Sequence, residues 1–125
     1  MSETKKTIMI VEDDIFVMDI YNMKITKDGM NAITAVNGVE AMKKLEEGAK
    51  PDLILLDILM PYMGGLEFLK KMRENEKFKN IPVVLLTNLS QKEEISEGLN
   101  LGAKDYLIKS HFTPTEVMEK INQYL

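Results

Sequence analysis

The sequence predicts an α/β fold: a doubly wound parallel sheet of five strands, covered by helices on both faces. Two patterns lead to this prediction. Short apolar runs alternate five times with segments of helical period along the 125 residues, with no linker, repeat or low-complexity stretch. The apolar runs are also nearly continuous, as in parallel strands that are buried on both faces. We therefore expect a single domain over residues 1–125, with its function at the carboxyl ends of the strands.

The composition excludes several classes of protein. Sixteen Lys and Arg residues face 20 Asp and Glu residues, which gives a net charge of −4, and no basic cluster stands out. Direct nucleic-acid binding is therefore not expected. The chain has no cysteine, so it forms neither disulfides nor thiolate metal sites. No apolar segment approaches the ~20 residues of a membrane span, and the N-terminus lacks the apolar core of a signal peptide. We expect a cytoplasmic protein without membrane insertion.

The first two strand–helix pairs follow from apolar spacing and from the residues that end each element. We expect strands at 8–11 and 31–36, and helices at 14–27 and 37–48. The first helix is indicated by apolar residues at helical spacing, namely Phe16, Ile20 and Met23. Asp28-Gly29 ends that pattern, whereas Asn37 can cap the second helix and Gly48 can end it.

The third strand, expected at 52–57, is the densest apolar run and ends on Asp57, shortly before Pro61. An aspartate at the end of a buried strand costs free energy unless it is solvated, paired or bound to a metal. Asp57 is therefore a candidate reactive group. A helix should follow from about Gly65.

The last two pairs are marked by capping signals. We expect strands at 81–86 and 106–108, with helices from Ser90 to near Gly102 and from Thr113 to the end. The stretch Ser90-Gln91-Lys92-Glu93 has the spacing of a capping box. Thr113-Pro114-Thr115-Glu116 combines a capping box with proline at the first helical position.

Charged and hydroxyl side chains follow the expected strands at one edge of the sheet. Glu12 and Asp13 follow the first strand, Asp57 the third, Thr87 the fourth and Lys109 the fifth. Two carboxylates about 4 Å apart repel by about 4 kcal/mol at an effective dielectric near 20. A hard divalent cation such as Mg²⁺ removes that repulsion and prefers oxygen ligands.

The candidate Mg²⁺ ligands are thus Glu12, Asp13 and Asp57, together with the backbone carbonyl of Leu59. The metal would neutralise charge on a phosphoryl group transferred to Asp57, since phosphoryl transfer is mostly positioning and charge stabilisation. Lys109 supplies a second positive charge there, and the Thr87 hydroxyl can donate to a phosphoryl oxygen.

This pattern resembles the receiver domain of two-component response regulators, the family that includes the chemotaxis response regulator. The likeness covers the chain from about Thr7 to Leu125. It rests on residues that lie in order at strand ends or in loops: Glu12, Asp13, Asp57, Met60, Pro61, Gly65, Thr87, Tyr106 and Lys109.

The resemblance implies a flavodoxin-like sheet with strand order 2-1-3-4-5. Because the sequence ends with the fifth expected helix, we expect no output domain. The resemblance also implies that a histidine kinase or phosphotransfer protein gives a phosphoryl group to Asp57 in the presence of Mg²⁺, with Asp57, Thr87 and Lys109 as the catalytic set. Thr87 and Tyr106 would then act as switch residues. They would alter the face made by the fourth helix, fifth strand and fifth helix, which binds a downstream protein target. Such a domain catalyses its own phosphorylation and dephosphorylation but is primarily a signalling switch.

The chain departs from the usual pattern of this family at several loop positions. Gly64 replaces a frequent aspartate, and Asn88 follows Thr87 where a small residue is usual. Ser110 follows Lys109 where proline, commonly in a cis bond, is usual, so the loop is either strained or follows another path. Leu59 and Leu89 flank the site and are apolar, which predicts a long-lived phosphorylated state.

Three other functions, and one other setting of the same function, compete with this interpretation. A nucleotide-binding domain would need a glycine-rich or hydroxyl-rich loop after the first strand, where this chain has three acidic residues. A phosphatase resembling the haloacid dehalogenase family would need a D-x-D pattern, which Asp57-Ile58-Leu59 lacks. The chain could also be a docking module that works without phosphorylation, which Mg²⁺ titration would distinguish. It could finally be the receiver fragment of a longer regulator.

Overall fold

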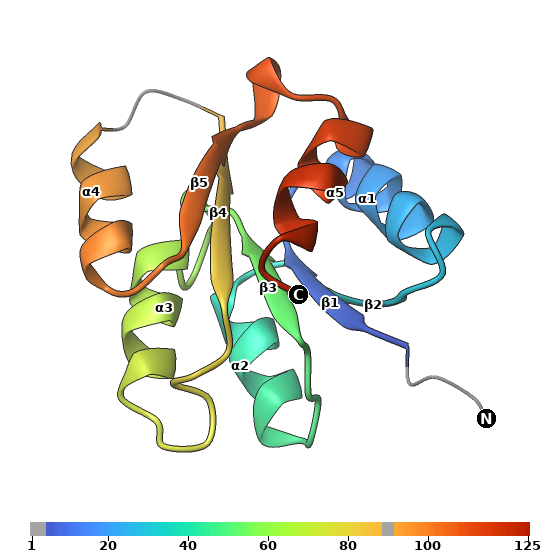
Figure 1. Cartoon of the computed structure of the whole chain (residues 1–125). Helices are drawn as coiled ribbons and strands as arrows, with labels where there is room; N and C mark the ends of the chain where they lie inside the picture. Colours follow the sequence, from blue (N-terminus) through green and yellow to red (C-terminus); the bar gives the residue numbers. More distant parts are fainter. Residues whose placement is uncertain (1–4, 89–91) are drawn as a thin grey trace.

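The computed structural model describes residues 5–88 and 92–125. Its parallel sheet has the strand order β2-β1-β3-β4-β5, as Figure 1 shows, so the predicted doubly wound, flavodoxin-like fold is confirmed. The strands are β1 (Thr7–Val11), β2 (Asn31–Ala35), β3 (Leu53–Leu56), β4 (Val83–Thr87) and β5 (Asp105–Ile108). The helices are α1 (Ile15–Lys27), α2 (Gly38–Glu46), α3 (Gly65–Arg73), α4 (Lys92–Asn100) and α5 (Pro114–Asn122), with a 3-10 turn η1 (Lys109–His111) after β5.

The helices form two layers around the sheet. Figure 1 shows α1 and α5 on one face and α2, α3 and α4 on the other. Each layer has its own apolar core, because alternate residues of the central strands point to opposite faces. Every residue of β3 and β4 is buried, as the continuous apolar runs predict. Within the described residues, no helix combines the length and the apolar character needed to cross a membrane.

The ends of the elements agree with the sequence to within two residues, except that α5 ends at Asn122, three residues before the expected end. Strand β4 begins at Val83 rather than 81, because Pro82 has no N–H to give to the ladder. The caps predicted at Asn37 and Thr113 are confirmed, the second as a complete capping box. Asp14 caps α1 by accepting the N–H groups of Phe16 and Val17. The capping box predicted at Ser90 lies outside the described residues.

The apolar stripe used to predict α1 does not face the core. The helix is confirmed, but its buried side chains are Met18, Tyr21 and Ile25. The predicted stripe faces outward, with Phe16 82%, Ile20 50% and Met23 72% exposed. Helix α1 is therefore apolar on opposite sides. Helical spacing alone does not reveal which of these two sides packs on the sheet.

Candidate functional site

Strand register brings the acidic residues together at the carboxyl edge of the sheet. Val11, the last residue of β1, pairs with Leu56, the last residue of β3. The next residues in each strand, Glu12 and Asp57, therefore come side by side, and the Asp57 N–H donates to the Val11 carbonyl at 3.0 Å. Asp57 lies one residue beyond β3 rather than inside it, at the point where the buried strand opens into a loop.

Lys109 reaches this edge from the far side of the sheet. It follows Ile108, which pairs with Thr87 at the end of β4. Its Nζ lies 3.4 Å from Asp57 Oδ2 and also donates a hydrogen bond to Glu12 Oε1. The ammonium group therefore bridges two carboxylates that would otherwise repel each other.

The carboxylates form a donor set that suits Mg²⁺. Oxygen atoms of Glu12, Asp13 and Asp57 all lie within 4.8 Å of one another. No other group of three such ligands is present among the residues that the structure describes. Three carboxylates and one ammonium leave an excess of negative charge, which a hard divalent cation with oxygen preference would neutralise. The residues thus fit the metal expected from the sequence.

Burial controls the electrostatics of this site. It raises the pKa of Glu12 to about 7; the hydrogen bond from Lys109 opposes the rise and the charge of Asp57 adds to it. Burial also raises the pKa of Asp57, against the opposing charge of Lys109. For Lys109, burial would lower the pKa, but the hydrogen bond to Glu12 and the charge of Asp57 raise it overall. The metal-free site therefore holds protons more readily than ordinary carboxylates do.

This predicts a pH-dependent stability in Mg²⁺-free buffer. Because the pKa of folded Glu12 lies above the value of 4.5 for the unfolded chain, the protonated form favours folding. The stabilisation is complete below about pH 4.5 and is lost as the pH rises through about 7, by about 3 kcal/mol. Between pH 4.5 and 8, the free energy of unfolding of the wild type should fall by about 3 kcal/mol more than that of Glu12→Gln.

Chemical denaturation of both proteins across this pH range measures the difference. The Glu12→Gln variant is the control because it keeps the shape of the side chain and cannot ionise. Parallel pH profiles of the two proteins would contradict the assignment to Glu12.

Thr87 and the neighbouring loops enclose a cavity of about 230 Å³ over Asp57. Its lining consists of Glu12, Asp13, Asp14, Asp57, Leu59, Thr87, Asn88 and Lys109. Thr87 is 1% exposed, so its side chain reaches the cavity from within the folded domain rather than from the surface.

A comparison with known protein families decides what kind of domain this is. The family model described as the response regulator receiver domain matches residues 8–122. The chain belongs to this family.

Individual relatives agree with this assignment. The receiver domain is 35% identical over 120 residues to the alkaline phosphatase synthesis transcriptional regulatory protein PhoP of Bacillus subtilis, covering 96% of the chain but 48% of that protein. It is 32% identical over 119 residues to the chemotaxis protein CheY1 of Helicobacter pylori, covering 94% of the chain and 95% of that protein. The chain also matches the crystal structure of the phosphorylated cyanobacterial phytochrome response regulator RcpA, with a TM-score of 0.83 and 26% identity. This match covers 96% of the chain and 91% of the RcpA chain. The chain thus spans about half the length of the first of these relatives.

The remaining residues singled out from the sequence differ in their relation to the receiver cavity. Tyr106 lies on β5, is 42% exposed, and does not line the cavity. Leu59 and Asn88 line the cavity, and Leu59 is 58% exposed, as expected of a residue at its rim. Leu89, the other predicted rim residue, lies outside the described residues. The Lys109–Ser110 peptide bond is trans, like every other peptide bond among the described residues. The chain forms η1 at this point. The loop therefore follows another path, one of the two alternatives that the sequence left open.

Two residues near the site were not predicted. Asp14, the N-cap of α1, also lines the cavity, because a cap at the start of α1 lies at the same sheet edge. Tyr21 lies on the buried face of α1, and burial together with the charge of Glu12 raises its pKa to about 12. No sequence signal distinguishes Tyr21 from an ordinary core tyrosine.

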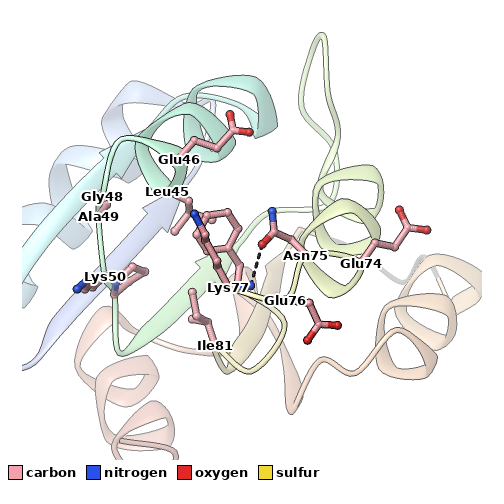
Figure 2. Close-up of a pocket in the computed structure, with 12 residues that line it drawn as sticks. Leu45, Glu46, Gly48, Ala49, Lys50, Glu74, Asn75, Glu76, Lys77 and Ile81 are labelled. Atoms are coloured by element: carbon pink, nitrogen blue, oxygen red, sulfur yellow. Dashed lines mark hydrogen bonds between the residues drawn. The ribbon is translucent and has the colours of Figure 1, made fainter.

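A larger hollow of about 1030 Å³ lies at the opposite end of the sheet, near the amino ends of β3 and β4 (Figure 2). Its floor includes Leu45 and Ile81, and Asn75 accepts the backbone N–H of Lys77 at its edge. The charges around it are of both signs and do not converge on one point in Figure 2. This hollow has no reactive constellation, so the smaller cavity over Asp57 is the candidate functional site.

Proposed function

We propose that this receiver domain accepts a phosphoryl group on Asp57 from a phosphohistidine of a histidine kinase or phosphotransfer protein. The observation that carries this proposal is the position of the Asp57 carboxylate, at a strand end and beside the Lys109 ammonium. An Asp57 oxygen attacks phosphorus, the P–N bond to the donor imidazole breaks, and its electron pair stays on that nitrogen, which takes up a proton. The product is an acyl phosphate on Asp57.

The chain supplies groups for the charge that moves in this step. The 3.4 Å contact between Lys109 Nζ and Asp57 Oδ2 places a fixed positive charge beside the incoming phosphoryl oxygens. The Thr87 hydroxyl lines the same cavity and can donate to one of these oxygens. Catalysis is thus positioning and charge stabilisation by Asp57, Thr87 and Lys109.

Glu12, Asp13 and Asp57, with the backbone carbonyl of Leu59, would hold Mg²⁺ at this site. The ion, when bound, would neutralise negative charge on the phosphoryl group. Asp13 is the exposed member of the set and Glu12 and Asp57 are buried, so the set is open to solvent on the Asp13 side.

The response to phosphorylation would pass from Thr87 to the surface of α4, β5 and α5. A groove of about 450 Å³ on this surface combines apolar side chains with charged ones of both signs. Its lining includes Ile95, Tyr106, Phe112, Lys92, Lys120 and Asp105. We propose that a rearrangement of Thr87 and Tyr106 changes this groove and thereby the affinity for a downstream protein target. The proposal places the domain in the cytoplasm, without membrane insertion or direct nucleic-acid contact of its own.

The receiver would act as one domain of 125 residues, either alone or within a longer regulator. CheY1 is matched over 95% of its length and PhoP over 48%, so relatives of both lengths exist. The role proposed for Asp57 is the same in both cases, because the cavity is formed by this domain alone.

Incubation with acetyl phosphate and Mg²⁺, followed by intact-mass measurement, tests the proposed function. We expect the mass of one phosphoryl group to be added with Mg²⁺ and not after chelation by EDTA. RcpA, which has been crystallised in a phosphorylated form, is a suitable positive control. An unchanged mass with Mg²⁺ present would support the alternative of a docking module that works without phosphorylation.

Lys109→Ala should separate metal binding from phosphoryl transfer. Removal of the ammonium leaves the three carboxylates with one less competing positive charge, so Mg²⁺ binding should be unchanged or tighter. Phosphorylation, or the response to it, should be impaired because the phosphoryl oxygens lose a fixed cation. Isothermal titration with Mg²⁺ and phosphorylation kinetics measure the two properties. Loss of metal binding with normal signalling would contradict this role.

The apolar rim predicts a long-lived acyl phosphate. Hydrolysis needs a water molecule in line with the Asp57 O–P bond, and the exposed Leu59 side chain cannot orient one by hydrogen bonding. Positioning of this kind is typically worth about 10²–10⁴-fold in rate. We expect Leu59→Asn to lose its phosphoryl group faster than the wild type, as measured by the decay of the phosphorylated mass. Leu59→Met is the matched apolar control, and equal rates in all three proteins would show that the rim is only packing.

A further inference from the structure

The outer face of α1 carries a continuous apolar stripe. Phe16, Ile20 and Met23 follow one another at spacings of four and three residues, and Lys27 continues the same line. Alternating spacings of four and three residues form the seam along which two helices pack side by side. Single exposed apolar residues are normal on a protein surface, but a stripe along a whole helix marks an interaction site.

This stripe is not part of the core. The opposite face of α1 already packs on the sheet through Met18, Tyr21 and Ile25, each at most 7% exposed. The stripe retains half or more of its exposure, so nothing within the described ranges covers it. A helix that is apolar on opposite sides is stable when both sides are packed. Among the residues that the structure describes, the outer side of α1 therefore has no packing partner.

The charges beside the stripe favour a second copy of this chain in the antiparallel direction. Asp14 caps the N-terminus of α1 and Asp19 lies in its N-terminal half, whereas Lys24 and Lys27 lie in its last turn. Lys24 pairs with the C-cap residue Asp28 at 3.2 Å, so Lys27 is the cation of this end that remains for a second copy. An antiparallel copy brings each acidic half against a basic end and also aligns the two helix dipoles favourably. A parallel copy would place like charges together.

The register of such a pair follows from the seam. In an antiparallel seam, Ile20 of one copy meets Met23 of the other, and Phe16 meets Lys27. A lysine over an aromatic ring is a favourable contact. Asp19 lies one turn from Phe16, so the long Lys27 side chain of the second copy can reach its carboxylate.

We propose that the outer face of α1 is a self-association surface that pairs two copies of this chain antiparallel across a two-fold axis. The residues that carry the pairing are Phe16, Asp19, Ile20, Met23 and Lys27. Three apolar side chains per copy cover less than the ~800 Å² that each partner buries in a standard interface. The dimer is therefore weak and forms at high protein concentration. This inference does not rest on the phosphoryl transfer proposed above.

Sedimentation velocity of the full chain from about 10 µM to about 1 mM tests the proposal. The wild type should shift from monomer towards dimer over this range. Ile20→Glu places carboxylates in the seam and should weaken the dimer by at least about tenfold. Val39→Glu is the matched control: Val39 is 51% exposed, close to the 50% of Ile20, but lies on α2. It should dimerise like the wild type, and circular dichroism verifies the fold of each variant.

A charge exchange tests the direction of the pair. Asp19→Lys and Lys27→Glu should each weaken the dimer, and the double variant should restore it, because only an antiparallel pair brings these two residues together. A wild type that stays monomeric at about 1 mM would overturn the proposal and leave the stripe to a helix of another protein. Equal weakening by Ile20→Glu and Val39→Glu, or a double variant weaker than either single one, would overturn it as well.

Discussion

The Asp57→Asn variant should gain no phosphoryl mass under conditions in which acetyl phosphate and Mg²⁺ phosphorylate the wild type. Asparagine keeps the shape of the side chain and its place at the end of β3, but its amide cannot attack phosphorus. The rate should therefore fall by more than about 10³-fold, as expected when a nucleophile is removed. Intact-mass measurement over time gives both rates. Asp57→Asn should remain folded, because it also removes a buried charge.

A matched control is available at the other end of the same strand. Asp52 precedes β3, and its carboxylate accepts the backbone N–H of Thr7 at 2.8 Å. Asp52→Asn keeps an acceptor oxygen there, so this variant should be phosphorylated like the wild type. If Asp57→Asn still gained a phosphoryl group, another side chain would be the acceptor and the function proposed for this site would be wrong.

The sequence predicted the fold and the location of the site for one physical reason. A strand buried on both faces is a continuous apolar run, and the first polar residue after it must lie at the sheet edge. Glu12 and Asp57 are such residues, so their convergence follows from the parallel direction of β1 and β3. The order of the strands came from the resemblance to receiver domains, because apolar runs alone do not specify which strands are neighbours.

Other features depend on tertiary packing that the sequence does not reveal. The period of α1 predicted the helix but not that Phe16, Ile20 and Met23 face outward, since both of its sides are apolar. The bridge from Lys109 to both Glu12 and Asp57 depends on the path of the chain after β5. That path contains a trans bond before Ser110, which the sequence left open.

Gly65→Ala should destabilise the domain and displace Asp57. A Cβ atom on Gly65 would lie 2.1 Å from the carbonyl oxygen of Asp57 and 2.9 Å from the Cα of Ile58. Both are backbone atoms, so no flexible side chain can move aside. The Gly65 N–H also donates to the Ile58 carbonyl at 2.8 Å, which holds the loop against the strand end. We expect the free energy of unfolding to fall by about 3 kcal/mol or more, measured by chemical denaturation.

Gly64→Ala is the control, because it adds the same methyl group one residue earlier. Its Cβ would lie 3.2 Å from the Ile58 carbonyl oxygen, a tight contact that a small shift relieves. The φ of Gly64 is −75°, which any residue adopts, and alanine also restricts the unfolded chain. The change in unfolding free energy should therefore stay within about 1 kcal/mol.

Phosphorylation by acetyl phosphate should be slowed in Gly65→Ala and nearly normal in Gly64→Ala, since the first substitution moves the backbone that carries the Asp57 carboxylate. Equal effects of the two substitutions would mean that the loop tolerates a methyl group at either position and that the close approach at Gly65 does not position Asp57.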